Sequence, residues 1–307
     1  MKDISESDIN NNIPLVTQKD KNRNVIAGNV AIGGQDVVIM AGPCTVESKQ
    51  QIFEIAKAVQ EAGATMLRGG IFKPLTFPYG DPLGKPDAGT TVKNDIHSRP
   101  KVLPIHEMFK TAEKRLAYFK EAGEKYRLPI VSEIVYADSL SMMAKYVDMF
   151  QIGYRHMFNM DLIEALSTTD KPLLIKRHVG ESLRSLLGVA EHFEARGKNN
   201  FAFCERGVSV PHTHNVNSRA ILDIQAIPAL KEYAPSVPVI IDPSHSTFKR
   251  NYVAPMSKAA IAAGADGLLI EVHHTPEAAW IDPLNAIGCD DFRLLLKDIE
   301  AISKIIR

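Results

Sequence analysis

Eight short apolar runs, most of them followed by a longer segment with helical periodicity, constrain the fold more than any other feature of this sequence. Most runs are nearly continuous in apolar residues, which is typical of strands buried on both faces of a sheet. Repeated alternation of strand and helix predicts an α/β fold, the (β/α)8 or TIM barrel, over residues 36–307. The expected strands lie at 37–42, 65–70, 129–133, 148–153, 172–176, 201–205, 238–242 and 267–271, and the expected helices at 48–63, 107–126, 138–146, 181–196, 218–233, 256–264 and 291–306.

An open, doubly wound sheet is the alternative for such an alternation. That fold usually carries a glycine-rich turn that binds a dinucleotide. The segment "RGGIF" at 68–72 does not match the G-x-G-x-x-G pattern. The barrel is therefore favoured.

The segments outside the regular alternation carry separate expectations. Residues 1–13 are polar and acidic, so we expect a disordered tail. Residues 14–35 read as a β-hairpin extension with a Gly-Gly turn, placed at the N-terminal end of the barrel. Residues 73–105 contain six prolines and no clear apolar period. A loop this long in a compact domain is usually functional, and it predicts a lid over the active site.

Composition excludes several classes of protein. The 36 Lys and Arg residues balance the 36 Asp and Glu residues, which argues against a nucleic-acid partner. Three cysteines are too few for a disulfide framework and fit a reducing compartment. No apolar run is long enough to span a bilayer, and the polar start is not a secretory signal. We therefore expect a cytoplasmic protein without a membrane partner.

A cysteine, a histidine and two carboxylates follow the first, seventh and eighth expected strands. A thiolate, an imidazole and carboxylates together suit a first-row divalent metal such as Mn2+, Fe2+, Co2+ or Zn2+. In a barrel of this kind the C-terminal ends of the strands carry the active site. The candidate metal ligands are Cys44, His245, Glu271 and Asp282. Each residue alone also has a structural explanation, Cys44 as a small buried side chain and His245 as part of a helix cap.

Ionisable residues also collect at the ends of the other expected strands. Buried charge without a partner is costly, so this placement indicates a binding site. The cations are Arg68, Lys73, Arg155, Lys176 and Arg206, and the carboxylates are Glu133, Glu205 and Asp242. Five cations in one cleft predict a strongly anionic ligand, a phosphate or a carboxylate. A structural ion pair between Glu205 and Arg206 is the alternative for those two residues.

The motifs "AGPC", "LRGGIFKP", "CERG", "IDPSHS" and "DGLLIEVHHTPEAAWID" resemble the 3-deoxy-7-phosphoheptulonate (DAHP) synthase family, in its short type I beta branch. The resemblance runs from about residue 28 to residue 306. It implies a barrel enzyme that condenses phosphoenolpyruvate with erythrose 4-phosphate, releases phosphate and uses a divalent metal. It also implies a homo-oligomer, either a dimer or a tetramer. The other binding partners that it implies are the two small-molecule substrates.

The resemblance also implies roles for individual residues. Cys44, His245, Glu271 and Asp282 match the family's metal ligands. Arg155, Lys176 and Arg206 match its phosphoenolpyruvate anchors. Lys73 is a candidate for proton transfer, and Glu133, Asp242 or a metal-bound water for assisting the attack of water. The expected substrate-binding set also includes Arg68, Lys73, Thr76, Glu205 and Asp242.

The chain departs from the family pattern on the side of the acceptor. After the second strand the family has Lys-Pro-Arg-Thr-Ser-Pro-Tyr, whereas this chain has "KPLTFPY", with Leu75 and Phe77. After the fourth strand the family has Gly-Ala-Arg-Asn-Met-Gln-Asn, whereas this chain has "GYRHMFN". Losing an arginine that holds a phosphate predicts a different aldehyde acceptor. The alternative is that the long loop supplies replacement cations.

Three other functions compete with this one. A Schiff-base aldolase would use Lys176 or Lys73 as its amine, without needing the metal ligands. A non-catalytic relative would only bind a sugar phosphate. The sister 3-deoxy-8-phosphooctulonate synthases share the scaffold but differ in the loop after the second strand.

Overall fold

The computed structural model describes residues 4–21, 23, 25–72, 92–93, 101–102, 105–211 and 220–307. The expectations for Lys73, Leu75, Thr76 and Phe77 lie outside the described residues. So does the expected lid, apart from a two-stranded antiparallel ribbon of β5 (Val92–Lys93) and β6 (Lys101–Val102).

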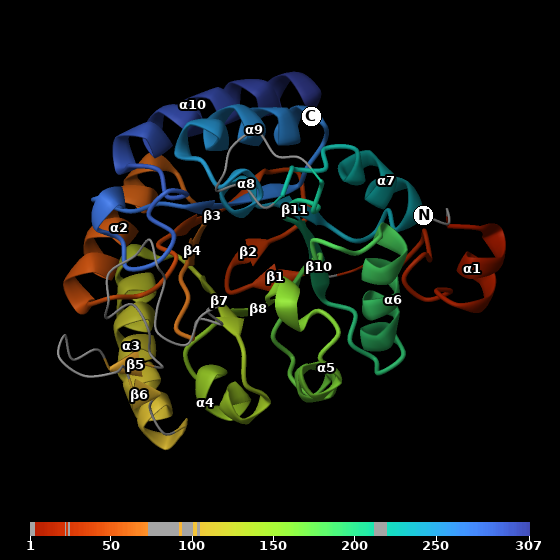
Figure 1. Cartoon of the computed structure of the whole chain (residues 1–307). Coiled ribbons are helices and arrows are strands. Elements are labelled where there is room, and N and C mark those ends of the chain that lie inside the picture. The colour runs from red at the N-terminus through yellow and green to blue at the C-terminus, as the bar shows by residue number, and fades with distance from the viewer. Residues whose placement is uncertain are drawn as a thin grey trace.

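Eight parallel strands form a closed barrel, which confirms the predicted fold (Figure 1). The barrel closes where the last strand pairs with the first, from Gly267 beside Val38 to Glu271 beside Gly42. Every predicted apolar run contains the core of one strand. The strands are β3 (Val38–Gly42), β4 (Met66–Arg68), β7 (Ile130–Ile134), β8 (Met149–Ile152), β9 (Leu173–Lys176), β10 (Phe201–Glu205), β11 (Val239–Ile241) and β12 (Gly267–Glu271).

Helices surround the barrel and bury one face each against it. In α2 (Lys49–Ala62), Ser48 caps the first turn by accepting a hydrogen bond from the Gln51 amide, and Gly63 ends the helix with a φ of 106°. The other helices are α3 (Ile105–Tyr126), α4 (Leu140–Met143), α5 (Met160–Ser167), α6 (Leu183–Glu194), α7 (Ala226–Tyr233), α8 (Pro243–Thr247), α9 (Arg250–Ala262) and α10 (Cys289–Ile306). Single turns of 3-10 helix are η1 (Ala137–Ser139), η2 (Tyr154–His156) and η3 (Pro276–Ala278). No helix in the described part of the chain is long and apolar enough to cross a membrane.

Helices α5, α7 and α9 depart clearly from the predicted pattern. Helix α5 was not predicted; it has eight residues and starts from a cap in which Asn159 accepts a hydrogen bond from the Leu162 amide. Helix α7 begins at Ala226, whereas the pattern predicted residue 218. Helix α9 begins at Arg250, six residues before its predicted start, and Pro255 inside it obscured its first half.

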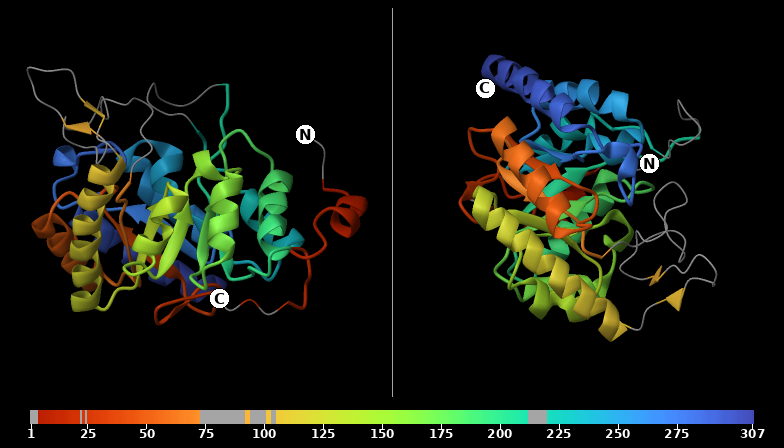
Figure 2. Two further views of the ribbon diagram at one scale, coloured as in Figure 1. Left: turned by 90° about the horizontal axis from the view of Figure 1, so that it is seen from below. Right: turned by 90° about the vertical axis from the view of Figure 1, so that its left-hand side faces the viewer.

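The inside of the barrel is a separate apolar core that reaches the N-terminal hairpin. Val25, Ala27 and Ile32 join the cluster of inward-facing strand residues, which includes Met40 and Cys204. The hairpin, β1 (Ile26–Ala27) and β2 (Val30–Ala31), therefore closes the N-terminal end, as predicted, and lies below the barrel in Figure 2 (left). Its turn is at Gly28–Asn29, not at the predicted Gly-Gly pair. Gly28 has a φ of 58°, and a Cβ there would lie 2.8 Å from Pro129 at the start of β7.

The first residues differ from the predicted disordered tail. Glu6–Asn11 form the helix α1, which begins with a reciprocal capping box between Ser5 and Asp8. Asp8 forms an ion pair with Arg184 of α6. Ile13 and Val16 are buried in the outer core of the barrel. Apolar contacts and a cap thus order a segment whose polar composition predicted a tail.

Candidate active site and metal centre

The structure brings the four predicted metal ligands together at the C-terminal ends of the strands. Cys44 follows β3, His245 lies in α8 after β11, Glu271 ends β12, and Asp282 lies in the loop after η3. One possible ligand atom from each lies within 4.8 Å of all the others. The Cys44 Sγ donates a hydrogen bond to Asp282 Oδ2 at 3.1 Å, and His245 Nε2 lies 3.2 Å from Glu271 Oε1.

The residues of this cluster fit a divalent cation. Cys44 and Glu271 are only 4% and 1% exposed and Asp282 is half-buried, and a thiol and two carboxylates so close together are costly unless cations compensate them. The mixed sulfur, nitrogen and oxygen donors suit Mn2+, Fe2+, Co2+ and Zn2+. The cluster therefore resembles the metal site that the sequence predicts, and the identity of the ion stays open.

Asp242 orients the histidine of this cluster. It caps α8, and its Oδ1 accepts a hydrogen bond from the His245 amide at 2.9 Å. Its Oδ2 lies 2.7 Å from His245 Nδ1, so that Nε2 is left to face the other ligands. Lys176 Nζ lies 2.5 Å from the same Oδ2. The predicted direct contact of Asp242 with substrate stays a prediction.

Electrostatics within this group follow from the same contacts. Burial raises the pKa of Asp242, but the neighbouring His245 and Lys176 outweigh burial and hold that pKa well below its ordinary value. Burial lowers the pKa of His245, but the carboxylates of Asp242 and Glu271 outweigh burial and leave it raised. The group is therefore a network of buried charges that depend on one another.

Arg68 lies against the metal ligands. Its Nη1 donates to the Pro43 carbonyl at 2.7 Å and to Glu271 Oε1 at 3.0 Å. Burial lowers the pKa of Arg68, whereas the Glu271 carboxylate and the Cys44 thiol raise it and prevail. Arg68 thus holds Glu271 in place, and its predicted contact with substrate stays a prediction.

The loop that carries Asp282 is fixed by residues that sequence reasoning did not single out. The Trp280 amide donates to Glu47 Oε1 at 2.8 Å, and the Arg115 guanidinium lies 5.2 Å from the Trp280 ring. Trp280 and Ile281 also pack against Cys44. Asp282 itself has a φ of 55°, in the left-handed region.

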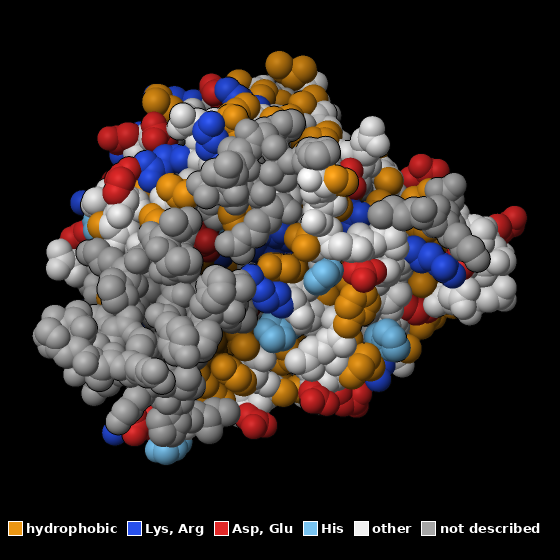
Figure 3. Space-filling model, in the orientation of Figure 1, with side chains coloured by type: hydrophobic (Ala, Val, Ile, Leu, Met, Phe, Trp, Pro, Cys, Tyr) orange, Lys and Arg blue, Asp and Glu red, His pale blue; other side chains and the backbone are white. Residues whose placement is uncertain are grey.

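Three predicted cations lie at the same end of the barrel. Lys176 ends β9 and is buried, and Arg206, which follows β10, is only 3% exposed. Burial lowers the pKa of Arg206, and its Nη2 donates to the His245 carbonyl at 2.7 Å. Arg155 lies in η2 and is exposed. Figure 3 looks onto this end, where Lys, Arg and His side chains gather near the middle of the face.

Glu205 has a different partner from the one considered in the sequence. Its Oε2 accepts from Arg177 Nη1 at 2.9 Å, and its Oε1 accepts from the Gly207 amide at 2.5 Å. Burial raises the pKa of Glu205. Arg177 also binds Asp223 at 2.8 Å. The expected alternative, a pair with Arg206, is therefore replaced by a pair with Arg177, and the predicted substrate contact of Glu205 stays a prediction.

Glu133 lies near Arg68 and close to the backbone after β8. Its charge contributes to the raised pKa of Arg68, after the nearer Glu271, Cys44 and Asp242. A Cβ on Gly153 would lie 1.8 Å from Glu133 Oε1, so a larger residue there would displace the Glu133 carboxylate. Glu133 is half-buried. Its predicted role at the site stays a prediction.

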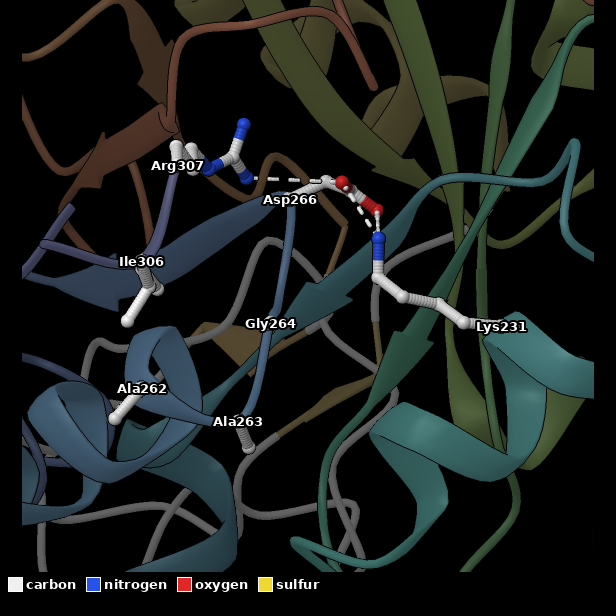
Figure 4. Close-up of a pocket in the computed structure, with 7 residues that line it drawn as sticks. All are labelled: Lys231, Ala262, Ala263, Gly264, Asp266, Ile306 and Arg307. Carbon is white, nitrogen blue, oxygen red and sulfur yellow. Dashed lines mark hydrogen bonds and ion pairs between the residues drawn. The ribbon is translucent and has the colours of Figure 1, made fainter. Parts of the chain in front are cut away.

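A pocket of about 370 Å³ lies away from these residues, beside the start of β12 (Figure 4). Asp266, directly before β12, accepts from Lys231 Nζ at 2.9 Å with both oxygens and lies 3.6 Å from Arg307. Arg307 also donates to the Gly34 and Gln35 carbonyls at the N-terminal end of the barrel. The contacts of this pocket tie α7 and the end of α10 to the sheet.

Comparisons with known proteins agree with this geometry. Residues 12–82 and 109–306 match the model of the DAHP synthetase I family. Phospho-2-dehydro-3-deoxyheptonate aldolase of Thermotoga maritima is 34% identical over 277 residues, which cover 90% of this chain and 72% of that protein. 2-Dehydro-3-deoxyphosphooctonate aldolase of Geotalea daltonii is 26% identical over 297 residues, covering 93% and 99%.

Solved structures give the same result. The crystal structure of DAHP synthase from Thermotoga maritima superposes with a TM-score of 0.76 at 33% identity, covering 93% of this chain and 74% of that one. Its truncated form gives a TM-score of 0.77 at 30% identity, with 94% of each chain covered. With the family match and the barrel geometry, these similarities show that the chain is an enzyme of the DAHP synthetase I family.

Proposed function

We propose that the protein condenses phosphoenolpyruvate with an aldose phosphate, erythrose 4-phosphate, to form DAHP and release phosphate. The observation that carries this proposal is the position of the Cys44, His245, Glu271 and Asp282 cluster beside buried cations. Lys176 contacts the same Asp242 carboxylate as the predicted ligand His245, and Arg206 donates a hydrogen bond to the His245 carbonyl. A cluster of predicted metal ligands beside cations that can bind an anion suits a reaction that joins an anionic donor to a polarised aldehyde.

The chain's own residues bind and orient the donor. Arg206 and Lys176 are buried cations, and with Arg155 they bind the phosphate and carboxylate of phosphoenolpyruvate. The methylene carbon of the donor then attacks the aldehyde carbon, water adds to the enol carbon, and phosphate leaves from the resulting hemiketal. Cys44, His245, Glu271 and Asp282 would hold a divalent ion, which would supply Lewis-acid polarisation of the aldehyde.

Glu133 is the carboxylate that we assign to the attacking water. Asp242 is bound by Lys176 and His245, and its lowered pKa makes it a weak base. Both oxygens of Glu205 accept hydrogen bonds. Of the three carboxylates predicted at the strand ends, this leaves Glu133. Its side chain is half-buried, and its charge acts on Arg68. Proton transfer by Lys73 stays part of the proposal.

The Schiff-base alternative is disfavoured by the contacts of Lys176. A Schiff base needs a free amine, whereas Lys176 is ion-paired with Asp242 in a buried site. Treatment with borohydride in the presence of substrate distinguishes the two mechanisms. A covalent adduct on Lys176 would support the Schiff-base aldolase.

The direct test is an assay of phosphate release by the Mn2+-loaded protein. We expect phosphate release to require both phosphoenolpyruvate and the aldose phosphate, and to stop when a chelator removes the metal. Cys44→Ser should lose most of this activity, because a serine hydroxyl stays protonated and uncharged and is a poorer ligand for a divalent cation than a thiolate. Absence of phosphate release with every aldose phosphate tested would refute the proposal.

A different acceptor is the second candidate, favoured by Leu75 and Phe77 in the sequence where the family has Arg and Ser. A seven-carbon product requires a four-carbon aldose, and an eight-carbon product requires a five-carbon one. Comparing kcat/KM for four-carbon, five-carbon and unphosphorylated aldehydes decides the question. A clear preference for erythrose 4-phosphate would reject the altered acceptor.

A further inference from the structure

One aromatic ring contacts two of the arginines at the proposed anion site. The Cζ atom of Arg155 lies 4.5 Å from the centre of the Tyr154 ring, and the Cζ atom of Arg206 lies 4.7 Å from the same centre. The two arginines follow β8 and β10, which are separated in the barrel by β9. Tyr154 therefore connects two cations that the backbone alone does not bring together.

The ring counters a physical difficulty of this arrangement. Two guanidinium groups near one another repel, and Arg206 is also buried, which lowers its pKa. The face of an aromatic ring carries negative charge density and attracts cations. A guanidinium that stacks on a ring keeps its N–H donors in its own plane, where they remain available to an anion.

The ring itself is held by a neighbour. The His178 ring lies 5.7 Å from the Tyr154 ring, tilted by 45°. His178 Nδ1 accepts a hydrogen bond from the Gly180 amide at 3.1 Å, which fixes the imidazole. Tyr154 thus contacts a fixed histidine as well as the two arginines.

We propose that Tyr154 is a positioning residue, whose ring holds Arg155 and Arg206 at the spacing that binds the phosphate group of the donor. The proposal rests on the proposed function in taking that donor to be phosphoenolpyruvate. The competing possibility is that the ring occupies the place of the anion. The two possibilities predict opposite effects when the ring is removed.

The test uses the full-length protein loaded with Mn2+ and three variants, Tyr154→Phe, Tyr154→Leu and Tyr154→Ala. Inorganic phosphate and phosphoenolpyruvate are titrated by calorimetry, and KM and kcat are measured separately. We expect Tyr154→Ala and Tyr154→Leu to weaken phosphate binding and to raise KM by about tenfold, with a smaller change in kcat, because the cation–ring attraction is lost. Tyr154→Phe keeps the ring and should restore binding to within about twofold of the original protein.

Tyr146→Ala is the matched control. Tyr146 is half-buried, and its hydroxyl bonds Glu113 of α3 on the outside of the barrel. The Tyr146→Ala variant should therefore bind phosphate as tightly as the original protein. Phosphate binding by Tyr154→Ala that equals or exceeds that of the original protein would overturn the proposal, as would a Phe variant as weak as the Ala variant. Phosphate binding requires no turnover, so failure of the positioning role and failure of the proposed reaction give different results.

Discussion

Among single residues, Asp242 has the most consequential contacts. One of its oxygens is shared between His245, a predicted metal ligand, and Lys176, a predicted donor anchor. Its charge therefore serves the metal centre and the anion site together. A neutral side chain of the same shape would disturb both.

We expect Asp242→Asn to lower metal affinity by about 10–100-fold, because the orientation of His245 depends on this carboxylate. Affinity is measured by competition with a coloured chelator. Asp298→Asn is the control, since Asp298 is exposed and pairs with Lys258 at the surface, away from the cluster. Equal metal affinity in Asp242→Asn and the original protein would contradict the assignment.

Glu133→Gln tests the residue that we assign to water activation. The amide keeps the shape but loses the base, so kcat should fall by about 100-fold or more. Binding of phosphoenolpyruvate, followed by calorimetry, should change little. A variant that retains full kcat would exclude Glu133 as the base and direct attention to Lys73.

At the scale of elements, the N-terminal hairpin depends on one backbone conformation. Gly28→Ala places a Cβ 2.8 Å from Pro129 and forces a non-glycine residue into a φ of 58°. We expect a loss of about 1–2 kcal/mol in the free energy of unfolding, measured by denaturant titration. Gly34→Ala is the control, because a Cβ there meets nothing within 4 Å. Equal losses in the two variants would argue against a local strain at the turn.

The elements also show how far the sequence was informative. The eight strands follow from runs of apolar residues, because a strand buried on both faces needs no polar side. The hairpin turn was misplaced because Gly33–Gly34 is the stronger local signal, whereas burial of Ala27 and Ile32 inside the barrel sets the actual register. Helix α5 was missed because eight residues show too few turns of apolar periodicity.

The site was predictable to a different extent. The cluster of Cys44, His245, Glu271 and Asp282 was predictable because its chemistry is distinctive and strand ends converge in a barrel. The Arg177–Glu205 pair was not found, since it depends on the register of β9 beside β10, where Lys176 lies opposite Cys204. Glu47 gave no signal, because its contacts are with residues far along the chain: its Oε1 accepts from the Trp280 amide and lies 3.4 Å from His273 Nε2.

For the whole molecule, the raised pKa of His245 predicts how stability depends on pH. The pKa of His245 is raised in the folded protein from its ordinary value of 6.5. Protonated His245 therefore stabilises the metal-free protein fully below pH 6.5, and this contribution is lost as the pH rises through the pKa of the folded state. Metal binding requires the neutral imidazole, so the stabilisation that bound metal provides grows as the pH rises.

We therefore expect the difference in Tm between Mn2+-loaded and metal-free protein to increase between about pH 6 and about pH 8. Scanning calorimetry of both forms measures it. In His245→Gln the increase should be much smaller. A Tm difference independent of pH would contradict the prediction.

The left-handed backbone of Asp282 has a consequence for the stability of this protein. Glycine adopts that conformation without cost, so Asp282→Gly would relax the loop of the metal-free protein while deleting a predicted metal ligand. Backbone strain and metal binding therefore make opposite demands at this position. The exchange should raise the stability of the metal-free protein and reduce the further stabilisation that bound metal provides.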